Sequence, residues 1–123
     1  MKAIIGVQSL DGVFREGKDF ARRADAGARM HEADFELSFT TPAQLVSELS
    51  PKRMELLQML KKSGPLSIRA LAKMMGRNYS NVHADVQRLI EHGLIEKDAS
   101  DHVLVPWDDV VVRMDASLMR LAA

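Results

Sequence analysis

The side chains with the clearest capacity for recognition lie in one short stretch of the sequence. They are hydrogen-bond donors and acceptors, together with one small methyl group: Arg77, Asn78, Tyr79, Ser80, Asn81, His83, Ala84, Gln87 and Arg88. Asparagine and glutamine amides match the edge of adenine, a guanidinium matches guanine, and an alanine methyl can contact the methyl group of thymine. This set therefore indicates contacts with base edges of double-stranded DNA.

A second set suits the phosphates of DNA, which fix the position of a protein without reporting sequence. It comprises Lys52, Arg53, Ser67, Arg69, Lys73 and Lys97. The chain as a whole has 17 basic and 17 acidic residues, but positions 50–93 contain eight Lys or Arg and three Asp or Glu, a net charge of +5. Positions 1–49 carry −2 and positions 94–123 carry −3. A basic segment between acidic flanks favours a nucleic-acid surface in the middle of the chain.

Capping residues divide this middle segment into short helices. Thr41-Pro42 and Ser50-Pro51 each place a capping side chain before a proline that suits the first helical turn. Ser67 is expected to cap a helix over 68–75 that Gly76 ends. The next helix is expected over 80–92, opened by Ser80 or Asn78 and ended by Gly93. Its apolar stripe consists of Val82, Val86, Leu89 and Ile90.

The pattern changes from helical to strand-like after Gly93. Positions 94–97 and 102–105 are strand-like segments separated by the polar turn 98–101, which predicts a β-hairpin. Positions 109–114 are a candidate for a further strand. Three helices, with a glycine-led turn between the last two, followed by a hairpin, is the order of a winged helix-turn-helix domain.

We therefore expect a mainly α chain with a β-hairpin wing. The expected domains are an N-terminal extension over 1–40, a winged helix-turn-helix DNA-binding domain over 41–114 and a C-terminal tail over 115–123. Within the extension, the sequence suggests a short strand over 1–7, a helix over 13–30, and a half-buried strand or extended packing arm over 35–39.

Asp85 is an acidic residue in the middle of the basic segment, so we expect it to pair with a basic side chain. Its spacing to Arg88 allows an i, i+3 ion pair, and Arg69 or Lys73 on the preceding helix are the other candidates. A structural role for this carboxylate is favoured over a role in recognition. Trp107, the only tryptophan, either anchors the wing on the domain or forms part of an interface, and the sequence favours a place in the core.

Three motifs carry a resemblance that covers about residues 35–112. They are Ser67-Ile68-Arg69, Asn81-Val82-His83-Ala84-Asp85-Val86 and Pro106-Trp107-Asp108. Through them the chain resembles MarR-like or ArsR-like winged-helix transcription regulators, and most closely a prokaryotic group of predicted DNA-binding antitoxins. The resemblance implies a repressor of its own operon that neutralises a toxin encoded beside it. One recognition helix reads few base pairs, so a homodimer on a two-fold operator is expected.

Two other functions stay open. The winged helix could bind only a partner protein, its acidic flanks docking a basic toxin, which the zero net charge favours. It could also belong to a ligand-responsive MarR-like repressor, for which the sequence offers no pocket signature.

Catalytic and cofactor functions are not expected. The chain has no cysteine, which excludes disulfides, thiolate zinc sites, iron–sulfur clusters and cysteine nucleophiles. It has no Walker loop, GxGxxG, GxSxG or HExxH motif. No apolar run approaches the roughly 20 residues of a membrane span, and the apolar start is too short for a signal peptide. The sequence therefore suggests a soluble cytoplasmic protein without metal, cofactor or membrane contact.

Overall fold

The computed structural model describes residues 1–7, 34–115 and 117–119. They belong to two compact units, one from Met1–Glu48 and Asp108–Ala123, the other from Leu49–Trp107. The helix expected over 13–30 lies outside the described residues, as does part of the expected tail.

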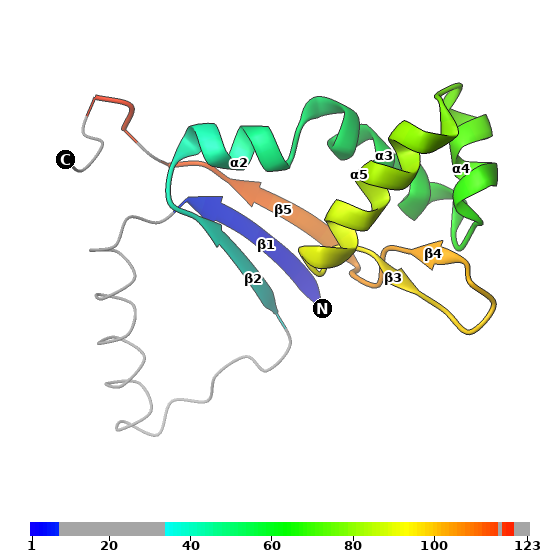
Figure 1. The fold of residues 1–123 in the computed structure, drawn as a ribbon. Helices are drawn as coiled ribbons and strands as arrows, with labels where there is room; N and C mark the ends of the chain where they lie inside the picture. The colour runs from blue at the N-terminus through cyan, green and yellow to red at the C-terminus, as the bar shows by residue number, and fades with distance from the viewer. Residues whose placement is uncertain (8–33, 116, 120–123) are drawn as a thin grey trace, which may run out of the picture. The chain divides into compact units, whose positions relative to one another are not determined.

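The first unit is a small parallel sheet with a helix packed on it (Figure 1). Its strands are β1 (Lys2–Val7), β2 (Phe35–Phe39) and β5 (Asp109–Arg113), in the order β2-β1-β5, and β1 is parallel to both neighbours. The helix α2 (Pro42–Glu48) contacts β1 and β2. It begins where the sequence predicted, because Thr41 Oγ1 accepts the Gln44 N–H at 3.1 Å.

The register of the sheet collects its apolar side chains on one face. Ala3 lies opposite Phe35 and Val110, and Ile5 lies opposite Leu37 and Val112. Neighbouring residues in register share a face, so this face is apolar throughout. Its buried side chains, together with one from α2, form the core of the unit: Ala3, Ile5, Phe39 and Leu45.

The second unit consists of three helices and a two-stranded hairpin. The helices are α3 (Pro51–Ser63), α4 (Ile68–Met75) and α5 (Tyr79–Glu91); the antiparallel strands are β3 (Glu96–Lys97) and β4 (Val103–Leu104). Ser50, Ser67 and Asn78 cap the helices through side-chain oxygens that accept backbone N–H groups. Leu66 exchanges two backbone hydrogen bonds with Val103, which ties the α3–α4 connection to the hairpin.

The core of the second unit is aliphatic. Its largest fully buried side chains are Leu56, Leu60, Leu71, Val82, Val86, Leu89, Leu94, Ile95 and Val103. Trp107 is half-buried, and its indole N–H donates to the Gly93 carbonyl oxygen at 3.0 Å. This hydrogen bond ties the segment after the hairpin to the end of α5, which agrees with an anchoring role for Trp107.

The structure confirms the helices and the hairpin predicted in the middle of the chain and corrects the fold class. The described residues form a mixed α/β structure of four helices and small sheets, not a mainly α one. Three segments judged separately as possible strands pair into one parallel sheet. Positions 42–48 and 108–114, expected within a DNA-binding domain over 41–114, cluster with that sheet rather than with α3–α5.

None of the helices among residues 34–115 combines the length and the apolar character needed to cross a membrane.

Candidate nucleic-acid interface

A tight turn joins α4 to α5. Gly76 ends α4 in the left-handed conformation, with φ 65°, which glycine adopts at little cost. The N–H of Arg77 donates to the Ala72 carbonyl oxygen at 3.0 Å, and the Asn78 side chain accepts the Ser80 N–H at 2.8 Å. Each step of the turn is thereby fixed by a local hydrogen bond, so the direction of α5 is set where it begins.

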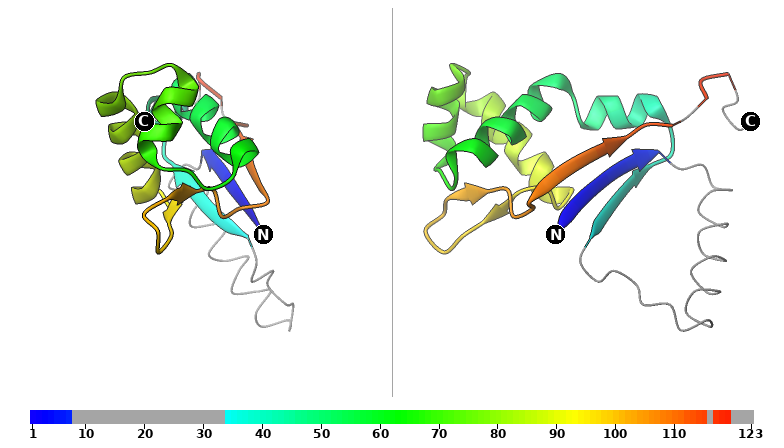
Figure 2. Two further views of the ribbon diagram at one scale, coloured as in Figure 1. Left: turned by 90° about the vertical axis from the view of Figure 1, so that its right-hand side faces the viewer. Right: turned by 180° about the vertical axis from the view of Figure 1, so that it is seen from behind.

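α5 has one buried side and one polar side. Val82, Val86 and Leu89 are completely buried. The predicted base contacts are exposed or half-buried: Ser80, Asn81, Ala84 and Arg88 are exposed, and His83 and Gln87 are half-buried. Figure 2 shows α5 from two further sides, together with α3, α4 and the hairpin of the same unit. The polar side of α5 is therefore available for recognition.

Asp85 connects three parts of this unit. Its Oδ1 accepts from Arg53 Nε of α3 at 3.0 Å, and its Oδ2 accepts from Arg77 Nη2 of the turn at 2.8 Å. The side chains of Arg53, Arg77 and Asp85 are 20%, 18% and 16% exposed, so these charges are largely shielded from water. One carboxylate thus holds α3 and the turn against α5.

The predicted partners of Asp85 were wrong. Its ion pairs are with Arg53 and Arg77, not with Arg88, Arg69 or Lys73. Arg88 pairs with Glu91 on the surface, at 2.8 Å. The sequence contained a signal only for the side of α5 on which Asp85 lies, because Asp85 is three residues after Val82 and four before Leu89. That spacing places it on the inner side of α5.

Aromatic and basic side chains meet at the start of α5. The Arg69 guanidinium lies 4.8 Å from the centre of the Tyr79 ring, a cation–π contact. The Tyr79 ring is 5.8 Å from that of His83. Three predicted contacts from α4 and α5 therefore form one cluster beside the turn.

The other predicted phosphate contacts differ in the hydrogen bonds and ion pairs that they already make within the chain. Lys52 and Lys73 are exposed, and neither makes an ion pair in the part of the chain that the structure describes. Ser67 uses its hydroxyl oxygen to cap α4, accepting the Ala70 N–H at 3.1 Å. Lys97 lies apart from these residues, on the hairpin, with its ammonium 3.5 Å from Asp101. Lys52 and Lys73 are thus the basic candidates that no interaction engages among the described residues.

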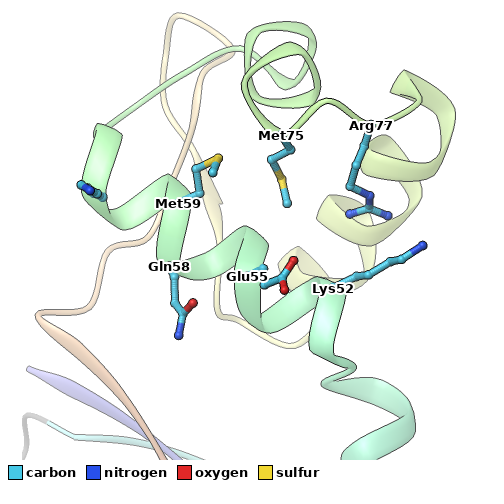
Figure 3. A pocket seen from close by; sticks show the side chains of 7 residues that line it. Lys52, Glu55, Gln58, Met59, Met75 and Arg77 are labelled. Atoms are coloured by element: carbon cyan, nitrogen blue, oxygen red, sulfur yellow. The ribbon is translucent and has the colours of Figure 1, made fainter.

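A groove of about 490 Å³ lies between α3, α4 and the turn that leads into α5 (Figure 3). Its lining residues come from α3, α4 and the turn: Lys52, Glu55, Gln58, Met59, Lys62, Met75 and Arg77. Met59 and Met75 point into the space between α3 and α4, and the charged groups lie around them. Arg77 Nη1 is buried there without a hydrogen-bond partner among the described residues. Sequence reasoning missed this groove, although Glu55, Met59 and Lys62 recur at helical spacing on α3.

Comparison with protein families places this unit in a known group. The family model HVO_A0114 matches residues 48–112, more than half of the chain, and the chain therefore belongs to the HVO_A0114 family. The match covers α3, α4, α5, the hairpin and most of β5, and so includes the whole candidate interface. Comparisons with curated proteins and with solved structures gave no match.

The Asp85 ion pairs predict a specific loss of stability. Asp85→Asn removes the negative charge between two shielded guanidinium groups and should lower the free energy of unfolding by roughly 2 kcal/mol. Glu91→Gln is the matched control, because it breaks a surface ion pair whose side chains are 44% and 62% exposed. It should cost less than about 0.5 kcal/mol. Urea unfolding followed by circular dichroism measures both, and equal losses would contradict the proposed difference.

Proposed function

We propose that this chain is a sequence-specific, DNA-binding transcription regulator whose unit Leu49–Trp107 is a winged helix-turn-helix domain. The observation that carries the proposal is the division of α5. Its apolar stripe is buried, while its amide, hydroxyl and guanidinium groups face outward within a basic segment. A helix with such a polar side fits the major groove, which admits one α-helix.

In this proposal α5 is the recognition helix. Asn81 and Gln87 supply amides for adenine edges, Arg88 supplies a guanidinium for guanine, and Ala84 offers its methyl group to thymine. Arg88 would exchange its surface partner Glu91 for a base edge, which costs little because that ion pair is solvated. The hairpin β3–β4 is the wing, and Lys97 on it is a phosphate contact.

The ion pairs of Asp85 change the roles proposed for two arginines. Arg53 and Arg77 are each bound to a largely shielded carboxylate, and a phosphate would have to compete with it. We therefore assign them to positioning α5. Lys52, Lys73 and Arg69 are the proposed phosphate contacts on α3 and α4, with the Arg69 side chain held against Tyr79.

The base contacts can be tested on DNA from upstream of the gene itself. Gln87→Ala should weaken binding about ten-fold, and Arg88→Ala by a similar factor, since a good base pair contact is worth roughly 1–3 kcal/mol. Gln58→Ala, a glutamine exposed on α3, is the matched control and should bind as the unaltered chain does. Fluorescence anisotropy with labelled duplex measures the affinities. Unchanged binding of both α5 variants would contradict the assignment of the recognition helix.

The phosphate contacts predict a particular salt dependence. The logarithm of the binding constant should fall linearly with the logarithm of salt concentration, by about 0.9 for each phosphate neutralised. Lys73→Gln should reduce this slope by about one and weaken binding to all sequences alike. Lys61→Gln is the control for loss of an exposed lysine outside the proposed contacts. A slope that Lys73→Gln leaves unchanged would remove Lys73 from the interface.

The role as an antitoxin rests on the resemblance to antitoxins alone. If it is right, the tagged chain should co-purify with the product of the adjacent gene, and α5 variants that have lost DNA binding should retain that product. A chain that binds this product but no duplex, even in dilute buffer, would favour the alternative of a module that binds only protein. A chain that binds the operator without a protein partner would leave a regulator that is not an antitoxin.

A further inference from the structure

β5 is an edge strand of the sheet β2-β1-β5. Its only strand partner among the described residues is β1, which pairs with it in parallel from Asp109 to Arg113. The backbone of an edge strand presents N–H and C=O groups that can pair with another chain. Natural proteins discourage such pairing with prolines or with charges in the middle of the strand. β5 has neither, because its centre is Val110-Val111-Val112.

The sequence of β5 is complementary to itself. It reads Asp-Val-Val-Val-Arg, with opposite charges at its two ends. When two copies of a strand pair across a two-fold axis, they must run antiparallel. With Val111 on the axis, Asp109 of each copy lies opposite Arg113 of the other, and Val110 lies opposite Val112. Directly opposite residues share a face of the sheet, so each carboxylate meets a guanidinium.

The faces of the sheet agree with this register. Val110 and Val112 are on the same face as the buried Ala3 and Ile5, yet Val112 is 41% exposed at the edge. Pairing would extend that apolar face across both copies. Asp109 and Arg113 lie on the opposite face and are exposed. The two valine pairs and the two ion pairs therefore fall on separate faces.

The Asp109 carboxylate makes a hydrogen bond that pairing of two β5 strands would replace. It accepts the N–H of Val110 at 2.8 Å. On pairing, that N–H would find a carbonyl oxygen of the second strand, and the carboxylate would turn to Arg113 of the second copy. Two charge-assisted contacts of the carboxylates are thus exchanged for two others, and backbone hydrogen bonds between the strands are added.

From these observations we infer that β5 pairs with β5 of a second copy of this chain, which joins two three-stranded sheets into one of six strands. The inference rests on the proposed function in one respect: a two-fold operator requires two copies of α5, and therefore a dimer. It names the surface that forms that dimer.

Charge reversal on the full chain tests this surface. Asp109→Arg and Arg113→Asp each place like charges opposite one another twice in the dimer, and each should raise the dimer dissociation constant roughly ten-fold or more. An equimolar mixture of the two variants should form a heterodimer with nearly the original affinity, since every pair is then opposite in sign. The double variant should form a homodimer with nearly the original affinity for the same reason. Lys61→Asp, which changes the charge of exposed α3 by the same amount as Arg113→Asp changes that of β5, should have no effect on the dimer dissociation constant.

Sedimentation velocity over a range of concentrations measures these dissociation constants, with circular dichroism to verify that each variant is folded. Recovery in the mixture supports the inference even if one variant alone is less stable. A full chain that stays monomeric, or single variants that dimerise as tightly as the original, would overturn it. Pairing of β5 with a different protein would also overturn it. A dimer that fails to bind duplex would overturn the proposed function and leave this interface standing.

Discussion

The position of α5 depends on one carboxylate that accepts from two arginines. Asp85 lies on the inner side of the helix, between residues of the buried stripe, where an unpaired charge would be costly. Arg53 approaches from α3 and Arg77 from the turn, so the carboxylate is satisfied only when all three elements are in place. The buried stripe packs α5 on the core, and the two directional ion pairs add contacts that depend on the positions of α3 and the turn. The Asp85 ion pairs thus add a polar contact near the core to the buried apolar stripe, which decides which side of α5 faces outward.

The two units differ in how far apart in sequence their contacting elements lie. In Leu49–Trp107 the elements follow one another closely, and capping side chains define each helix start. In the other unit, β1 pairs with β5 although almost the whole chain separates them in sequence. The N-terminal ammonium donates to the Asp108 carboxylate at 2.6 Å, and the Asp108 N–H donates to the Met1 carbonyl oxygen at 2.9 Å. The beginning of β1 is thereby attached to the segment that leads into β5.

Local signals made the middle of the chain predictable. α3 begins where Ser50 indicated, α4 begins and ends where Ser67 and Gly76 indicated, and the strands of the hairpin lie within the predicted segments. The sheet could not be derived in this way, because the alternation of residues predicts a strand but not its neighbour. The partners of Asp85 were missed for a related reason, since Arg53 is 32 residues away and no local spacing connects them. The candidate base contacts were easier to place, because the apolar period of α5 decides which side faces outward.

The parallel arrangement of β1 and β5 has a consequence for the order of events during synthesis. β1 is synthesised before β5, so the side of β1 that pairs with β5 stays unpaired while the whole of Leu49–Trp107 is translated. That unit has its complete set of helices and hairpin before the sheet can close. A truncated product ending before position 109 would therefore carry all of α5 but an unfinished sheet, with the apolar β1 open to wrong partners.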